Sequence, residues 1–354
     1  MTASQRNMKV AVLGCGRWGP NHIRVFSSLA GCEVSAVADT DPAQLKRMAE
    51  MFRDVNCVAD YRQILADPQI DAVVIVTPTS THHQIVREAI LAGKHVFCEK
   101  PLCETTEQAL ELSDLARANG KVLFVGHVFL FNAGLLKVKE LIDQGELGAI
   151  QYLSSSRTNL GPIRKDVNVA VDLASHDISI FNWLLDSEPE IVTATGAVFL
   201  QPGVEDVAFI SLRYPKNVLA GIQVSWLDPK KVRQITIVGS KRMATWDDLE
   251  LMTPVAVYEK GAYATSSDYG DFLHISYWDG DVKLPKIEAH EPLKSQDDYF
   301  LKAIREKLVT NRSDGPFGAG VVRVLEAVSR SLEQAGAPVR VNGSVPSKAT
   351  TSVA

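Results

Sequence analysis

The chain has 354 residues, of which 46% are hydrophobic and 22% charged, a balance typical of globular proteins with a full core. This length favours two domains, and the net charge of −5 gives no indication of a nucleic-acid or anionic-membrane partner. Because the N-terminus lacks a signal-peptide pattern and no stretch approaches the roughly 18 apolar residues of a membrane span, we expect a cytoplasmic protein.

A strand, a glycine-rich turn and a helix open the chain. The strand is predicted over residues 9–13 and the helix over residues 20–29. Between them lie Gly14, Gly16 and Gly19, in a G-x-G-x-x-G pattern. Such glycines permit a tight turn and let phosphates approach the backbone, while the helix N-terminus presents free N–H groups. The sequence therefore predicts a site for a dinucleotide pyrophosphate.

An acidic residue follows the second predicted strand. Residues 33–38 form that strand, and Asp39 lies at its end, where an acid hydrogen-bonds the adenosine ribose. The next residues are Thr40 and Asp41, with no lysine or arginine beside them, so the sequence favours NAD over NADP. The alternative is that Asp39 caps a helix that starts near Pro42.

Alternating helices and strands continue to about residue 126, which indicates a doubly wound parallel sheet with right-handed crossovers. We therefore expect a Rossmann dinucleotide-binding domain over residues 1–126. Its further strands are predicted at 57–58, 72–76, 95–98 and 122–125, and its further helices at 42–53, 61–65, 81–92 and 104–119.

The pattern then changes to an α+β type. Residues 190–288 are dominated by alternating strand patterns, which predict a large open mixed or antiparallel sheet. Residues 127–343 are therefore expected to form a substrate and oligomerisation domain, and 344–354 a disordered tail. The remaining elements of this part are helices at 134–144, 174–185, 295–309 and 318–334, and a strand at 150–157.

Polar residues follow the strands at the edge of the sheet where ligands bind. They are Thr77-Pro78, Glu99-Lys100-Pro101 and Gly126-His127. We expect Lys100 to point toward the nicotinamide end of a dinucleotide, with its backbone fixed by Pro101, and the bond between them can be cis. The alternative is that Lys100 is a solvated surface lysine.

A second cluster lies at the start of an apolar helix. Asp172 and His176 are four residues apart and share a helix face if the helix starts early, with Asp177 beside them. A histidine beside a carboxylate is a suitable general base. An N-capping Asp172 and a core His176 are the alternative. The five cysteines form no C-x-x-C pair, so we expect neither a disulfide framework nor a metal site.

Over nearly its whole length the chain resembles the Gfo/Idh/MocA family of NAD(P)-dependent oxidoreductases. The segments that carry this resemblance are VAVLGCGRWGPNHIRVF, VIVTPTSTHHQIVREAILAGKHVFCEKPL, GHVFLFN and the D-x-x-x-H of Asp172 and His176. The EKP motif is the most distinctive of them. Within the family, the chain is most similar to bacterial nucleotide-sugar enzymes of the UDP-N-acetylglucosamine 3-dehydrogenase type.

The resemblance implies roles for the matching residues of this chain. It assigns Lys100, His176 and Asp172 to catalysis. It assigns cofactor contacts to Gly14, Gly16, Arg17, Trp18, Gly19, Asp39, Thr77, Pro78, His82, Glu99 and Lys100. Substrate contacts are expected from His127, Phe129, Asn132 and Arg157, although His82 and His127 can also be structural and Arg157 can form a salt bridge.

The expected reaction is oxidation of a sugar hydroxyl, at C3 of a UDP-sugar such as UDP-N-acetylglucosamine, by hydride transfer to NAD. A 3-ketosugar reductase, an inositol or aldose dehydrogenase, an NAD-dependent glycosidase and a non-catalytic cofactor sensor are alternatives. The resemblance further implies a homodimer or homotetramer formed through the C-terminal sheet.

Overall fold

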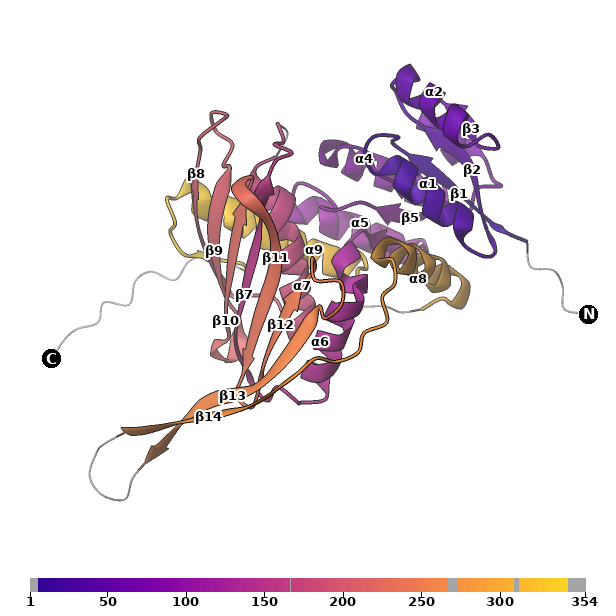
Figure 1. Ribbon diagram of the computed structural model, residues 1–354. Coiled ribbons are helices and arrows are strands. Elements are labelled where there is room, and N and C mark those ends of the chain that lie inside the picture. The colour runs from indigo at the N-terminus through magenta and orange to yellow at the C-terminus, as the bar shows by residue number, and fades with distance from the viewer. Residues whose placement is uncertain (1–5, 166, 267–272, 309–311, 343–354) are drawn as a thin grey trace, which may run out of the picture. The chain divides into compact units, whose positions relative to one another are not determined.

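The computed structural model describes residues 6–165, 167–266, 273–308 and 312–342, so the predicted tail lies outside the described residues. The chain forms two compact units (Figure 1). The first comprises residues 1–132 and 289–322, and the second comprises 133–288 and 323–354. The boundary lies at residue 132, a few residues after the expected one near residue 126. Residues 289–322, which we expected in the second domain, belong to the first unit. Among the helices that the structure describes, none combines the length and apolar character that a membrane span requires.

The first unit contains a parallel sheet in the order β3-β2-β1-β4-β5-β6. Its strands are β1 (Met8–Leu13), β2 (Cys32–Ala38), β3 (Asn56–Val58), β4 (Ala72–Ile75), β5 (His95–Cys98) and β6 (Leu123–Val125). The order reverses between β1 and β4, which is the switch point where ligands bind in such sheets. The predicted doubly wound sheet is therefore confirmed.

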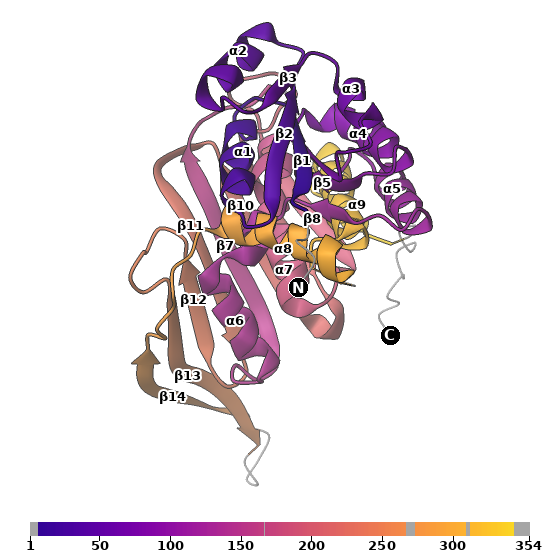
Figure 2. The ribbon, with the colours of Figure 1, turned by 90° about the vertical axis from the view of Figure 1, so that its right-hand side faces the viewer.

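Helices cover both faces of this sheet, and Figure 2 shows α1 and α4 on opposite sides of it. The helices are α1 (Gly19–Ser28), α2 (Pro42–Met51), α3 (Tyr61–Ala66), α4 (Thr79–Leu91), α5 (Thr106–Ala118) and α8 (Pro292–Glu306), with a 3-10 turn η1 (Val128–Phe131). Residues of α4 and α5 share one apolar core with the strand residues that face them, such as Leu13 and Ile75. Because both faces are covered, the central strands are apolar throughout rather than alternating.

An aromatic cluster on the opposite face explains why residues 289–322 belong to the first unit. Phe300 of α8 lies 5.7 Å from Phe97 of β5 and 5.9 Å from Phe124 of β6, measured between ring centroids. Phe26 of α1 completes the cluster at 6.3 Å from Phe300. Helix α8 is therefore part of the core of the Rossmann sheet, although it lies about 170 residues beyond the last strand.

The second unit contains a sheet in the order β14-β13-β12-β11-β7-β10-β9-β8-β15. Only β7 and β10 pair in parallel among its described strands, so the predicted open mixed sheet is confirmed. The strands are β7 (Ile150–Leu160), β8 (Ile191–Ala197), β9 (Val207–Arg213), β10 (Leu219–Ser225), β11 (Leu227–Gly239), β12 (Met243–Asp247), β13 (Val255–Ser266), β14 (Leu273–Lys283) and β15 (Val339–Arg340).

Helical segments lie against one face of this sheet (Figure 1). They are α6 (Ala133–Asp143), a π-helical segment η2 (Ala170–Ala174) and α7 (Ser175–Leu185), while a short turn η3 (Pro215–Asn217) joins β9 to β10. Helix α9 (Gly315–Glu333) begins in the first unit and ends in the second. On the sheet, Tyr152, Phe209 and Leu219 are 45%, 55% and 48% exposed.

Candidate functional site

The glycine-rich turn after β1 has the geometry that a pyrophosphate requires. Gly14 has φ +99°, and a Cβ atom there would lie 2.9 Å from the carbonyl carbon of Val76. A Cβ atom on Gly19 would lie 2.4 Å from the carbonyl oxygen of Gly14, so helix and turn approach too closely for any side chain. Nothing lies within 4 Å of the corresponding point at Gly16, which leaves its backbone open to a ligand.

The N-terminus of α1 is suited to an anion. No acidic residue lies in its first turn, and its N-cap residue, Trp18, forms no side-chain capping bond. Pro20 in this turn has no N–H, and the Asn21 N–H donates to the Trp18 carbonyl oxygen at 3.0 Å, so it is mainly the helix dipole that favours negative charge there. Arg17 and Trp18 are both exposed beside the turn.

Asp39 lies beside the same turn at the end of β2. Its Oδ2 accepts a hydrogen bond from the Cys15 N–H at 2.6 Å, and its Oδ1 accepts one from the Asp41 N–H at 2.8 Å. The cap of α2 is Asp41, whose Oδ1 accepts from the Ala43 N–H at 2.8 Å. The alternative interpretation of Asp39 as the helix cap is therefore wrong. The turn, the helix end and Asp39 together fit an NAD molecule.

His82 holds two loops at the edge of the sheet. Its Nδ1 lies 2.9 Å from the carbonyl oxygen of Pro101, and its Nε2 lies 2.9 Å from that of Thr77. Burial lowers the pKa of His82, so the neutral ring donates to one of these carbonyls. The side chain is buried, and the contact with the cofactor that the sequence predicts for it stays a prediction. Thr77 and Pro78 precede α4 in the loop after β4, and the Thr77 hydroxyl oxygen accepts a hydrogen bond from the Thr81 hydroxyl at 2.7 Å.

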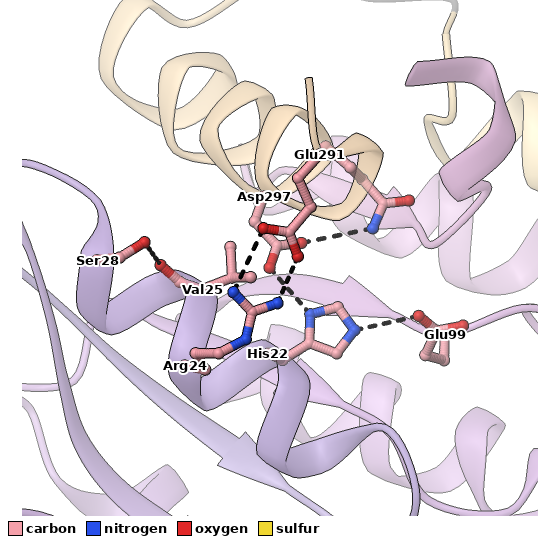
Figure 3. Close-up of polar contacts among 8 residues, drawn as sticks. His22, Arg24, Val25, Ser28, Glu99, Glu291 and Asp297 are labelled. Atoms are coloured by element: carbon pink, nitrogen blue, oxygen red, sulfur yellow. Dashed lines mark hydrogen bonds and ion pairs between the residues drawn. The ribbon is translucent and has the colours of Figure 1, made fainter. Parts of the chain in front are cut away.

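The Glu99-Lys100-Pro101 segment follows β5, and the Lys100–Pro101 peptide bond is cis. Lys100 is partly buried, in contrast to the alternative of a fully solvated lysine. Oε2 of Glu99 accepts a hydrogen bond from the Lys100 N–H at 3.2 Å. Oε1 of Glu99 lies 3.1 Å from Nε2 of His22, a buried residue of α1 that the sequence analysis does not include (Figure 3).

The residues after β6 are more structural than expected. The His127 ring is buried and packs edge-on against Phe317, with centroids 5.6 Å apart. Neither ring nitrogen has a hydrogen-bond partner among the described residues, and burial lowers the pKa of His127 to about 3. The packing role is thus the better interpretation of His127. Phe129 lies within η1 and Asn132 at its C-cap, both partly buried.

Asp172 lies in the second unit, on the π-helical segment η2. Its Oδ1 is 3.2 Å from Nη1 of Arg164, and its Oδ2 accepts a hydrogen bond from Nε1 of Trp226 at 3.3 Å. The N-cap of α7 is Ala174, so the alternative of an N-capping Asp172 is wrong. His176 follows in the first turn of α7 and is partly buried. The helical structure does start early, as the predicted shared face of Asp172 and His176 requires.

Arg157 has a different environment from the one expected. Its Nε lies 2.7 Å from Oδ2 of Asp177 and its Nη2 lies 3.2 Å from Oδ1, and both side chains are buried. This bidentate ion pair joins β7 to α7 beneath the surface. The guanidinium is thus committed to Asp177, and the interpretation of Arg157 as a substrate-pocket residue gives way to a structural role.

Residues 8–127 match the oxidoreductase family with an NAD-binding Rossmann fold, and residues 135–245 match the GFO/IDH/MocA C-terminal domain. An inositol 2-dehydrogenase of Rhizobium meliloti is 32% identical over 338 residues, which cover 92% of this chain and 97% of the relative.

Two further matches illustrate the range of similarity. The uncharacterized oxidoreductase YrbE of Bacillus subtilis is 30% identical over 230 residues, covering 62% of this chain and 67% of the relative. The structure of the UDP-N-acetylglucosamine 3-dehydrogenase GnnA from Acidithiobacillus ferrooxidans has a TM-score of 0.79 at 24% identity, covering 93% of this chain and 99% of the other. This last match establishes a shared fold.

Proposed function

The chain belongs to the Gfo/Idh/MocA family of NAD-dependent oxidoreductases, and from this premise we propose that it oxidises a secondary hydroxyl of a cyclitol or sugar ring. The observation that carries the proposal is the placement of Lys100. It is a partly buried lysine at the carboxyl end of β5, with its backbone N–H bound by Glu99, in the sheet that also holds the glycine turn and Asp39.

The first unit supplies the cofactor contacts in this proposal. The backbone around Gly16 and the N-terminus of α1 would hold the pyrophosphate of NAD, and Asp39 the adenosine ribose. Bound NAD supplies the hydride acceptor. Lys100 donates a hydrogen bond to the substrate oxygen and stabilises the negative charge that develops on it as the proton leaves.

The second unit supplies the base. His176 accepts the hydroxyl proton, a role for which an imidazole is suited near neutral pH. Asp172, one helical turn earlier, stabilises the resulting imidazolium. Contacts with Arg164 and Trp226 orient the Asp172 carboxylate. These roles of Lys100, Asp172 and His176 are proposals based on the family pattern and on the local geometry of each residue.

A neutral polyhydroxylated ring is the first substrate candidate. The relative that aligns over almost its whole length is named an inositol 2-dehydrogenase. In addition, the Arg157 guanidinium, a cation that could bind a substrate phosphate, is paired with the buried Asp177. A cyclitol or free sugar needs no such cation, because a protein recognises its hydroxyl groups through hydrogen bonds.

The second candidate is a nucleotide sugar oxidised at C3, such as UDP-N-acetylglucosamine. It is favoured by Arg164, whose side chain contacts Asp172 and is 36% exposed, and by the exposed Lys165 next to it. Two cations at this position are suited to a diphosphate. The same residues would serve the reverse reaction, the reduction of a 3-ketosugar.

We further propose that the exposed apolar side chains of the second sheet are covered by another copy of the chain. Leu219 of β10 lies opposite Tyr152 of β7 in the sheet register, and Phe209 lies on the neighbouring β9. Exposed apolar side chains on neighbouring strands of a sheet are a common feature of interfaces. A homodimer or homotetramer is the expected assembly, and its mass in solution tests this directly.

The proposed activity is tested by following NADH absorbance with purified protein, NAD and a panel of inositols, free aldoses and UDP-, dTDP- and GDP-sugars. Parallel reactions with NADP test the role of Asp39. Oxidation of inositols or aldoses supports the first candidate, and oxidation confined to nucleotide sugars supports the second. Absence of NADH formation across the panel, and of NADH consumption with the matching keto compounds, would contradict the proposed function.

A further inference from the structure

A buried histidine joins three separate segments of the first unit. His22 lies on α1, Glu99 directly follows β5, and Asp297 lies on α8 (Figure 3). Nδ1 of His22 is 3.1 Å from Oδ2 of Asp297, and Nε2 is 3.1 Å from Oε1 of Glu99. The side chains of His22 and Asp297 are both 0% exposed. One imidazole ring thus fills the space between two carboxylates.

With both carboxylates ionised, this geometry needs a doubly protonated ring, and the charge of His22 in turn opposes the burial that raises the pKa of Asp297. Carboxylate oxygens are acceptors, and a neutral imidazole has a single N–H, so only an imidazolium donates to Asp297 and Glu99 at once. Burial by itself lowers the pKa of His22, but the charge of Asp297 and the hydrogen bonds to both carboxylates raise it to about 10. His22 is therefore a cation at neutral pH.

The other groups near this cluster do not compete for the ring. Nε2 of Gln296 donates to the second oxygen of Asp297 at 3.4 Å. Arg24 of α1 pairs with Glu291 at the start of α8, on the surface (Figure 3). The Cys32 thiol is neutral, since burial raises its pKa to about 12. Asp297 and Glu99 are thus the charged partners of His22 within the described residues.

The contact continues from His22 to the backbone of Lys100. Glu99 accepts from His22 with Oε1 and from the Lys100 N–H with Oε2. Its carboxylate also lies against Gly126, where a Cβ atom would be 2.8 Å from Oε1. The carboxylate is therefore fixed at both oxygens and on the side that faces Gly126.

We propose that His22 is a positioning residue: anchored on Asp297, it fixes the Glu99 carboxylate, and Glu99 fixes the backbone from which Lys100 projects. The inference rests on the proposed function, in which Lys100 contacts the reacting oxygen. Helix α1 thus links the pyrophosphate turn at its N-terminus to the lysine after β5. Misplacement of a catalytic group by about 1 Å costs on the order of 100-fold in rate.

The first test needs no substrate. Amide hydrogen exchange is measured at Lys100 in the wild-type chain and in the His22→Gln variant. A glutamine cannot donate to both carboxylates from the position of the ring, so we expect exchange at Lys100 to become about tenfold faster, the effect of losing one hydrogen bond. The matched control is Arg24→Gln, which breaks a surface pair between the same two helices and should leave Lys100 unchanged. Equal protection of Lys100 in all three proteins would overturn the proposal.

A second test follows the protonation of His22 itself. In protein labelled with ¹⁵N-histidine, the pair of ring resonances lost in His22→Gln identifies this residue among the eight histidines. We expect both ring nitrogens of His22 to remain protonated at pH 8.5 in the wild type. In Asp297→Asn the ring should lose one of these protons at a lower pH. Asp297→Asn also serves if His22→Gln does not fold. A ring that is already neutral at pH 7.5 in the wild type would refute the ion-pair geometry.

The kinetic test is a double-mutant cycle with myo-inositol and NAD, or with the best substrate of the panel. His22→Gln should lower kcat about ten- to 100-fold with a change in NAD Kd below about threefold, and should have no further effect in a Lys100→Ala background. If the losses in kcat of the two single variants multiply in the double variant, His22 has a general structural role and the proposal is overturned. If Lys100→Ala itself retains wild-type kcat, the proposed function fails instead, and the exchange and NMR results still decide the role of His22.

Discussion

Replacing Gly16 by alanine tests the cofactor turn, because the structure predicts an effect on NAD binding without an effect on folding. A Cβ atom at Gly16 meets nothing within 4 Å, and the residue does not need a positive φ. The methyl group would instead project into the space that the pyrophosphate occupies. Loss of one hydrogen bond to a charged group costs about 1.5–3 kcal/mol, which corresponds to a Kd for NAD about 10- to 150-fold higher.

Gly19→Ala provides the contrasting variant. Its Cβ atom would lie 2.4 Å from the carbonyl oxygen of Gly14, which is backbone and cannot move aside cheaply. Overpacking of this kind costs about 1–3 kcal/mol, so this variant should lose stability as well as NAD affinity. Gly221→Ala is the control for NAD affinity, since Gly221 also has open space but lies on β10, in the second unit and away from the turn in sequence.

The assay is a fluorescence titration with NAD, for which Trp18 is a natural reporter because it is 44% exposed at the turn, together with thermal unfolding. Gly16→Ala should keep the wild-type Tm and lose affinity, and Gly19→Ala should lose both. Wild-type NAD affinity in Gly16→Ala would show that the pyrophosphate does not approach this backbone, and would refute the assignment of the turn.

Three further predictions concern single charges. Asp39→Asn should weaken NAD binding about tenfold and narrow the preference for NAD over NADP, measured by titrating both cofactors. The amide lacks the negative charge of Asp39 and has only one oxygen to accept hydrogen bonds from the ribose. Asp177→Ala should lower the free energy of unfolding by about 3–5 kcal/mol in urea, since it removes the buried carboxylate that the Arg157 guanidinium bonds at two positions; a change below about 1 kcal/mol would contradict a buried pair. The pKa of His22 rises on folding from 6.5 to about 10, so its stabilising contribution is complete below pH 6.5 and is lost as the pH rises through 10. The difference in unfolding free energy between the wild type and His22→Gln should therefore shrink between pH 7 and pH 10, and a constant difference would argue against the imidazolium.

Features set by local sequence could be predicted, while those set by long-range pairing could not. The turn from Gly14 to Gly19 and the strand end at Asp39 are short-range patterns whose residue types are dictated by backbone geometry. The helix predicted over residues 295–309 is α8, Pro292–Glu306, and its sequence is amphipathic. That pattern shows which side of the helix is apolar but not which surface it covers, so its place on the Rossmann sheet, beside Phe97 and Phe124, was missed.

Buried charges show the same limit. His22 and Asp297 are 275 positions apart, and nothing in the sequence near either residue indicates the other. The position of His22 on the buried face of α1, four residues before Phe26, was the one available signal, since a buried histidine requires partners. Arg157 presents the opposite case: an arginine in a strand is equally compatible with a substrate phosphate and with a buried carboxylate, and only the fold places Asp177 beside it.

The central claim is that this chain oxidises a hydroxyl group with Lys100 and His176 as the groups that act on it. The most direct measurement is NADH formation by the wild type, Lys100→Ala and His176→Ala, each saturated with NAD and with the best substrate of the panel. Each substitution should lower kcat at least about 100-fold while the Kd for NAD and the Tm stay near the wild-type values. Turnover within a few-fold of the wild type in either variant would contradict the assigned role of that residue and the mechanism built on it.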